Sequence, residues 1–305
     1  MRQGRVPGSL HYQGAAQAAR WRALYERWSP FVQRPGYRAM FDAGFEQVVS
    51  QASESVAVIG VGCGTGDKEL ALIGRLLARS VNMTFAPVDI SVPLVTAAGL
   101  LARKSLPSAG IHPLVADLSD PETDLIDWLG LTLPATDQRV FTFFSMLPNF
   151  EPAGILPRLA GWLRPHDRLL LTANLAPGDD FNAGMARILP QYDNPETRAW
   201  LATFLEQGGV LPADGEMTFQ VEAHPTEEGI RRVVARWRFS RSCRLQVTTG
   251  SIDFAAGDEL ELFTSARFQN PGVVKHLRRH GLDLEASWLA PDGEEGLYLC
   301  RLASA

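Results

Sequence analysis

The sequence predicts an α/β protein with a Rossmann-like, mostly parallel sheet of seven strands and an inserted α+β domain. Three observations support this fold class. Short apolar runs alternate with helical stretches over residues 55–175, as in a parallel sheet covered by helices on both faces. A glycine-rich turn follows the first run, at residues 60–66. Beyond residue 212 the pattern changes to strands with alternating apolar residues, which is typical of an antiparallel sheet with one wet face.

Two helices are expected before the first strand. Residues 1–14 are polar and contain several glycines, so we expect them to be mobile. Aromatic and apolar residues recur at helical spacing over residues 15–49, with prolines interrupting the pattern. Core packing is the expected role of this aromatic stripe, and an open alternative is that Tyr25 or Tyr37 faces a ligand.

The first half of the chain then alternates strands with helices. Residues 56–59 are an apolar run that enters the glycine turn, and a helix is expected over residues 65–78. The other expected elements are strands at 83–90, 111–118, 139–145 and 167–175, and helices at 92–104, 123–129 and 152–163.

The second half departs from this alternation and then returns to it. Residues 181–208 are expected to be mostly helical, followed by strands at 217–222, 232–239, 242–248 and 259–264. A helix at 270–280 and a β-hairpin at 282–289 and 296–302 then close the sheet at seven strands. We therefore expect a core domain of residues 43–178 plus 265–305, and a discontinuous second domain of residues 15–42 plus 179–264.

Charge and cysteine content narrow the functional class. The 305 residues carry a net charge of −5 and scattered arginines, which does not indicate a nucleic-acid surface. The N-terminus lacks the apolar segment of a signal peptide, and no apolar run approaches the ~18 residues of a membrane span. The cysteines, Cys63, Cys243 and Cys300, are far apart, which fits a reducing compartment without disulfides or a metal site. We expect a cytoplasmic protein that acts on a small molecule and binds no metal.

The glycine turn and two acidic residues predict a site for the adenosine half of a cofactor. Glycines let the backbone approach a ligand closely, and the helix that follows has free amides at its start. Asp89 ends the second strand, where a carboxylate accepts both ribose hydroxyls, and Asp117 ends the third, where it accepts the adenine amine. The spacing G-x-G-x-G and the closing hairpin favour S-adenosyl-L-methionine over a nicotinamide cofactor. Both acids could instead be ordinary caps at strand ends.

Six motifs follow one another in a specific order: GCGTGDK, PVDIS, SMLPNF, DRLLLTANL, QYD and GDELELFTSARF. In this order they resemble the histidine-specific methyltransferase family, whose best-known members are the histidine Nα-methyltransferases of ergothioneine synthesis. The resemblance covers most of the chain. It implies a class I methyltransferase core with a discontinuous substrate domain, and N-methylation of an amino acid or a related small amine.

The resemblance also implies roles for cofactor-binding residues. Gly62, Gly64 and Lys68 match the family's cofactor loop. Asp89 matches the ribose acid and Asp117 the adenine-side acid. Ser145, directly after the fourth strand, is expected in the same site.

The substrate side is matched by residues from later motifs. Asn149 matches the asparagine that holds the amino-acid head group of the substrate, and Tyr192 matches a tyrosine that helps to hold it. We expect these two residues to orient the substrate during catalysis. Tyr37 and Ser265 match residues of the substrate pocket.

Several positions depart from the family pattern. Phe263 stands where the histidine-type members carry a glutamate facing the imidazole, and Phe144 and Pro148 stand where they have small residues. Gly60 occupies a place that many methyltransferases give to an acid. A pocket that lacks the imidazole-binding carboxylate loses affinity for histidine. We therefore expect a different amine, with Phe144 and Phe263 lining its pocket.

The sequence is compatible with three uses of the cofactor site. Methyl transfer needs alignment and exclusion of water, with no dedicated base. The phenylalanines could instead favour attack on the aminocarboxypropyl chain, by transfer or by intramolecular cyclisation, with release of methylthioadenosine. A binding module without chemistry is the third alternative, and the intact glycine loop argues against it.

Overall fold

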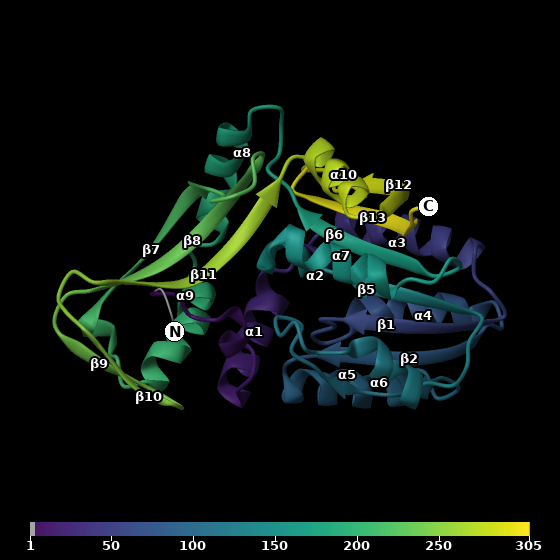
Figure 1. Cartoon of the computed structure of the whole chain (residues 1–305), viewed down its shortest axis with the longest axis horizontal. Coiled ribbons are helices and arrows are strands. Elements are labelled where there is room, and N and C mark those ends of the chain that lie inside the picture. The colour runs from purple at the N-terminus through teal and green to yellow at the C-terminus, as the bar shows by residue number, and fades with distance from the viewer. Residues whose placement is uncertain (1–3, 305) are drawn as a thin grey trace.

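A mostly parallel sheet and a smaller antiparallel sheet form the two ends of the molecule in the computed structural model, which describes residues 4–304 (Figure 1). Strands of the larger sheet run in the order β12-β13-β6-β5-β1-β2-β3, and β4 also pairs with β2. Their bounds are β1 Ser55–Val61, β2 Asn82–Asp89, β3 Gly110–Ile111, β4 Leu114–Val115, β5 Gln138–Phe143, β6 Arg168–Asn174, β12 Leu282–Leu289 and β13 Glu295–Leu302. β13 is antiparallel to both of its neighbours, and the other pairings in this sheet are parallel.

The expected strand at 111–118 is divided into β3 and β4, so the sheet has eight strands instead of seven. His112 donates its backbone N–H to Phe85, and Ala116 donates to Asp89. Pro113 lies between these two bonds and has no N–H to donate. A proline therefore interrupts the ladder at this edge of the sheet, where it is best tolerated.

Helices cover both faces of the larger sheet. Along β1, Val56 and Val58 pack under the helices of one face, while Ala57 and Ile59 face the other, as the alternation of side chains in a strand requires. The first face is covered by α3 Pro35–Ser50, α4 Asp67–Ala78 and α5 Val92–Ser105. The second face is covered by α6 Leu125–Thr132, α7 Pro152–Trp162 and α10 Asn270–Arg279.

The smaller sheet consists of β7 Gly215–Ala223, β8 Ile230–Phe239 and β11 Glu259–Phe268, in the order β11-β8-β7. A hairpin of β9 Cys243–Val247 and β10 Gly250–Phe254 extends beyond it, and β10 was not among the expected strands. β11 continues past residue 264 to Phe268, which forms a bridge with Leu175 after β6. The long strand β11 therefore connects the two ends of the molecule (Figure 1).

Three further helices lie beside the smaller sheet: α1 Ala15–Trp28, α8 Phe181–Ile188 and α9 Pro195–Gln207. α1 packs on α9, where Arg20 donates to the carbonyl of Ala199 and forms an ion pair with Glu206. The short helices are α2 Pro30–Gln33, η1 Gly8–His11, η2 Leu147–Asn149, η3 Leu189–Gln191 and η4 Pro212–Asp214. None of the helices within residues 4–304 is long and apolar enough to cross a membrane.

The N-terminal segment is anchored along β11. The backbone N–H of Val6 donates to Glu261 over 2.8 Å, and the buried His11 ring contacts the carbonyl of Leu262 at 2.6 Å. The expectation that residues 1–14 are mobile is therefore wrong for residues 4–14, because the edge of β11 offers them backbone partners. Residues 1–3 of that expectation lie outside the described residues.

Candidate active site

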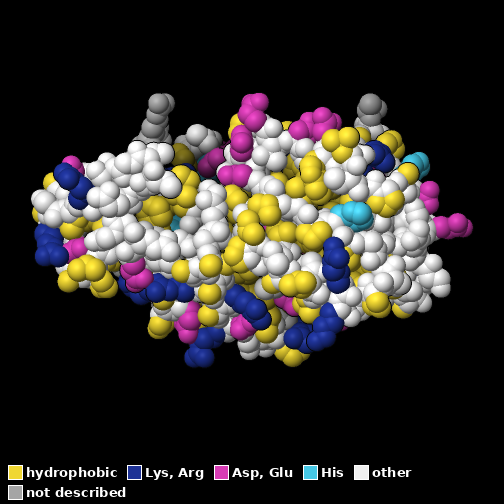
Figure 2. All heavy atoms as spheres, turned by 90° about the horizontal axis from the view of Figure 1, so that it is seen from below, with side chains coloured by type: hydrophobic (Ala, Val, Ile, Leu, Met, Phe, Trp, Pro, Cys, Tyr) yellow, Lys and Arg dark blue, Asp and Glu magenta, His cyan; other side chains and the backbone are white. Residues whose placement is uncertain are grey.

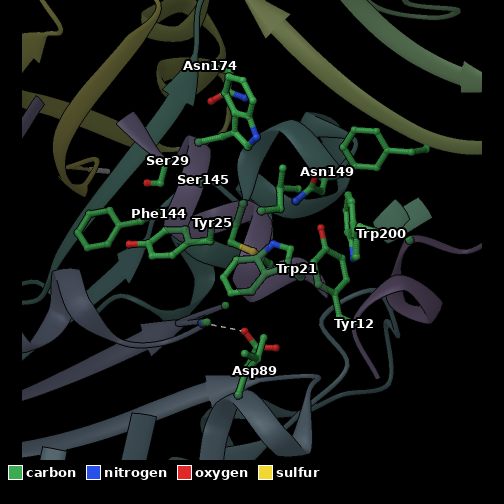
Figure 3. A pocket seen from close by; sticks show the side chains of 18 of the residues that line it. Tyr12, Trp21, Tyr25, Ser29, Asp89, Phe144, Ser145, Asn149, Asn174 and Trp200 are labelled. Atoms are coloured by element: carbon green, nitrogen blue, oxygen red, sulfur yellow. Dashed lines mark hydrogen bonds between the residues drawn. The ribbon is translucent and has the colours of Figure 1, made fainter. Parts of the chain in front are cut away.

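A cavity of about 520 Å³ lies where the carboxyl ends of β1, β2 and β5 face α1 and β11. Figure 3 shows Asp89 and Asn174 on opposite sides of this view, with Trp21, Tyr25 and Tyr12 between them. The cavity brings together all the predicted site residues except Ser265; they are Tyr37, Gly62, Gly64, Lys68, Asp89, Asp117, Phe144, Ser145, Asn149, Tyr192 and Phe263.

The glycine turn forms one wall in a left-handed backbone conformation. Gly62 has φ +72° and Gly64 has φ +55°. Residues other than glycine rarely adopt this left-handed backbone region. A β-carbon on Gly64 would lie 2.7 Å from the ring of Trp21, and one on Gly62 would collide with Met146. Both positions therefore need glycine for conformation and for space.

Asp89 is held in place by the glycine turn. Its Oδ2 accepts the N–H of Gly64 and its Oδ1 accepts the N–H of Ser91, each over 2.9 Å. Burial raises the pKa of Asp89, and these amide bonds oppose the rise. A carboxylate oxygen has two lone-pair directions, so each oxygen can still accept a ligand hydroxyl.

Asp117 lies further along the same sheet edge, after β4. Its Oδ1 accepts two hydrogen bonds from Ser119, from the backbone N–H over 2.8 Å and from the hydroxyl over 2.5 Å. This pair of bonds fixes the orientation of the carboxylate beside the cavity.

Lys68 and Ser145 meet at the end of β5. The Nζ of Lys68 donates to the Ser145 hydroxyl over 3.1 Å and lies over the rings of Phe41 and Phe144, 5.1 and 5.6 Å from their centroids. Ser145 has φ +59°, while its backbone N–H is held by Thr172 over 2.7 Å. A strained non-glycine residue at a cavity wall is a frequent feature of functional sites.

The side chain of Phe144 packs against α3. Its ring packs against Phe41 at 5.2 Å and Phe45 at 6.3 Å, and it is 6% exposed. Phe144 therefore lines the cavity beside Lys68.

Tyr192 and Ser265 form a bonded pair. Their hydroxyl oxygens are 2.8 Å apart, and Arg267 donates to the Tyr192 hydroxyl over 3.1 Å. Ser265 is buried and does not line the cavity. The structure therefore places Ser265 behind Tyr192, as support for the tyrosine.

Tyr37 and Asn149 differ in how free their polar groups are. The Tyr37 hydroxyl donates to Asp292 over 2.8 Å, so it fastens the turn between β12 and β13. Asn149, at the end of η2, is exposed to the cavity, and its backbone N–H donates to Met146. Of these two residues, Asn149 has the side chain better placed to contact a ligand.

Five aromatic residues that line the cavity form what we call the aromatic wall: Tyr12, Trp21, Tyr25, Trp200 and Phe263. Figure 3 labels the first four of them. Ring centroids are 5.3 Å apart for Tyr12 and Trp200, 5.5 Å for Trp200 and Phe263, and 5.4 Å for the stacked Trp21 and Tyr25. The prediction of core packing for the aromatic stripe over residues 15–49 holds only in part for its first helix, because Trp21 and Leu24 pack against the core of the smaller sheet and also line the cavity. The many aromatic residues on this polar helix were the available signal.

Sequence reasoning also missed two buried acids that line the cavity. Glu69 is 3% exposed, and its Oε1 accepts the hydroxyl of Thr142 over 2.9 Å. Glu295 is 8% exposed, and its buried Oε1 has no hydrogen-bond partner within residues 4–304. Within the same residues, no group of three or more His, Cys, Asp or Glu side chains is placed to hold a metal ion.

Residues 38–302 match the model of a protein family described as histidine-specific methyltransferase, SAM-dependent. The chain belongs to this family. It is an S-adenosylmethionine-dependent methyltransferase. Its mostly parallel sheet, covered by helices on both faces, confirms the predicted α/β fold class.

Two curated relatives carry the name "Histidine N-alpha-methyltransferase". The protein from Mycobacterium tuberculosis (strain CDC 1551 / Oshkosh) is 26% identical over 82% of this chain and 77% of its own length. The protein from Mycolicibacterium smegmatis is 26% identical over 81% of this chain and 76% of its own length. Among solved structures, the 1,6-didemethyltoxoflavin-N1-methyltransferase of Burkholderia thailandensis covers 98% of this chain and 91% of that one, with 12% identity and a TM-score of 0.47. A likeness of that size carries no argument about substrate.

The site of this methyltransferase fits its cofactor. The glycine turn lines the cavity beside Asp89, and Asp89 keeps acceptor capacity for ligand hydroxyls. Lys68 adds an ammonium group and Glu69 a carboxyl group to the lining of the same cavity. These are the groups that a ligand with a ribose and a zwitterionic amino-acid end requires.

Proposed function

We propose that this enzyme N-methylates an amino acid or a related small amine other than histidine. The observation that carries the proposal is the single cavity shared by the glycine turn and the residues predicted for the substrate, Asn149 and Tyr192. The names of the curated relatives support an amine nitrogen as the acceptor.

In this proposal the chain supplies binding, orientation and a dry surrounding. S-adenosylmethionine, when bound, supplies a methyl group on a sulfonium. Asp89 and the glycine turn hold the adenosine end, while Asn149 and the Tyr192 hydroxyl orient the head group of the acceptor. The aromatic wall excludes water from the nitrogen. Holding two reactants in line supplies most of the acceleration in such a reaction.

The acceptor pocket is polar at one side and apolar at the other. Phe263 packs edge-on against Trp200 and cannot accept a hydrogen bond from an imidazole. Glu295, by contrast, has a buried oxygen without a partner among the described residues, and an unpaired buried carboxylate is costly. An acceptor with a cationic group and an apolar or aromatic part satisfies both features.

Incubation with S-adenosylmethionine and a panel of amino acids and amines tests the proposal. Mass spectrometry of the nucleoside and of the acceptor should find S-adenosylhomocysteine together with a methylated amine. Methylthioadenosine as the only nucleoside product would replace this proposal with chemistry on the aminocarboxypropyl chain. Preference for histidine over every apolar or aromatic acceptor would contradict the assignment of the pocket.

We further propose that the enzyme acts in the cytoplasm on free small molecules. Cys63, Cys243 and Cys300 are all free thiols, which suits a reducing compartment. On the face shown in Figure 2, Lys and Arg side chains are dispersed among acidic and apolar ones, with no single basic patch that would suit a nucleic acid.

A further inference from the structure

The order of strands fixes the direction in which the cofactor lies. Asp117 follows β4, Asp89 ends β2, the glycine turn follows β1, and Ser145 follows β5. These strands are successive neighbours along one sheet edge. A ligand with its adenine at Asp117 and its ribose at Asp89 therefore extends its amino-acid end across β1 toward β5.

Two side chains of opposite charge lie at that end, both from the first turn of α4. Lys68 reaches the Ser145 hydroxyl over 3.1 Å. Glu69 points to β5, where its Oε1 accepts the hydroxyl of the fully buried Thr142 over 2.9 Å. Both residues line the cavity. An amino-acid zwitterion has one group for each of these charges.

The backbone of β1 leaves room for Glu69. Gly60 pairs in register with Thr142, and a β-carbon on Gly60 would lie 3.1 Å from the Cγ of Glu69. The side chain of Glu69 comes from α4 and occupies the space that the glycine leaves free.

Burial leaves this carboxylate poorly compensated before a ligand binds. Glu69 accepts a hydrogen bond from its own backbone N–H and one from the neutral Thr142 hydroxyl, and the charge of Lys68 lies nearby. These contacts do not offset its burial, which raises the pKa of Glu69 to about 7. A buried carboxylate needs a well-placed cation, or several hydrogen-bond donors, to offset the cost of its desolvation. A ligand cation in the cavity provides such a partner.

We propose that Glu69 binds the α-ammonium group on the methionine part of S-adenosylmethionine. Glu69 is thus a cofactor-binding residue, and its side chain lines the cavity beside Gly60. The inference rests on the family's methyl donor and is independent of the acceptor proposed above.

The experiment measures binding of two nucleosides by isothermal titration calorimetry. S-adenosylhomocysteine carries the amino-acid end, while 5′-methylthioadenosine has the same adenosine and thioether without it. Glu69→Gln should weaken S-adenosylhomocysteine binding by about tenfold to a hundredfold, since a charge-assisted hydrogen bond is lost. Binding of methylthioadenosine should change by less than about threefold.

Asp67→Asn is the matched control, because Asp67 lies in the same helical turn, lines the same cavity and is exposed. It should leave the affinities for both nucleosides nearly unchanged. The proposal is overturned if Glu69→Gln weakens both nucleosides equally, which would indicate a structural role. It is equally overturned if S-adenosylhomocysteine binding survives in Glu69→Gln or depends on Asp67 instead. None of these outcomes involves the acceptor, so they are separate from a failure of the proposed function.

Discussion

Replacing Glu69 with glutamine should change how the stability of the ligand-free enzyme depends on pH. Burial raises the pKa of Glu69 from 4.5 to about 7, against the smaller effects of the Thr142 hydroxyl and the Lys68 charge. The folded protein thus binds this proton more tightly than the unfolded chain does. The stability that results is complete below about pH 4.5 and is lost as the pH rises through about 7.

The size of the effect follows from the two pKa values. Each pKa unit corresponds to about 1.4 kcal/mol, so the stability lost between these limits is on the order of 3 kcal/mol. Glutamine resembles the protonated carboxyl group in shape and does not ionise. The free energy of unfolding of Glu69→Gln should therefore exceed that of the wild type by less than about 1 kcal/mol at about pH 5 and by about 3 kcal/mol at about pH 8.5.

Urea unfolding followed by tryptophan fluorescence measures this difference at both pH values. Asp89, whose pKa burial also raises, and Lys68 are present in both proteins, so the difference between the two curves isolates Glu69. Burial keeps the pKa values of the neighbouring Cys63 and Tyr25 above their ordinary range, outside the tested window. A difference in free energy of unfolding that is the same at both pH values would refute the reasoning.

Three further variants test the site. Asp89→Ala should weaken S-adenosylhomocysteine binding by about tenfold to a hundredfold, because two ribose hydroxyls lose a charged acceptor; calorimetry measures this, and an unchanged affinity would remove Asp89 from the cofactor site. Asn149→Ala should lower kcat by about tenfold or more while the affinity for S-adenosylhomocysteine stays the same, because the residue orients the acceptor. Steady-state kinetics that do not differ from those of the wild type would show that this role is wrong. Glu295→Gln should raise KM for a cationic acceptor by about tenfold, because its buried oxygen then loses its charge; an equal effect on neutral acceptors would argue for a structural role instead.

The parallel sheet and the glycine turn were determined by the sequence itself. Alternating apolar runs and helices are local patterns, so the strands at residues 55–61 and 82–89 and the helix between them agree with the expected elements. The glycine turn is a local feature too, because the left-handed backbone at Gly62 and Gly64 requires glycine at those two positions. The edge of the sheet differs from the prediction, because Pro113 divides one expected strand into two.

The chemical character of the cavity was decided by tertiary structure. Trp21 lies over Gly64 and Ser265 lies behind Tyr192, and both contacts join segments far apart in the chain. Glu69 is an acid in the first turn of a helix, where the helix dipole alone explains an acidic residue. Its side chain enters the cavity only because α4 packs on β1 at a glycine. Sequence periodicity shows which residues share a face of a helix, while packing decides what that face meets.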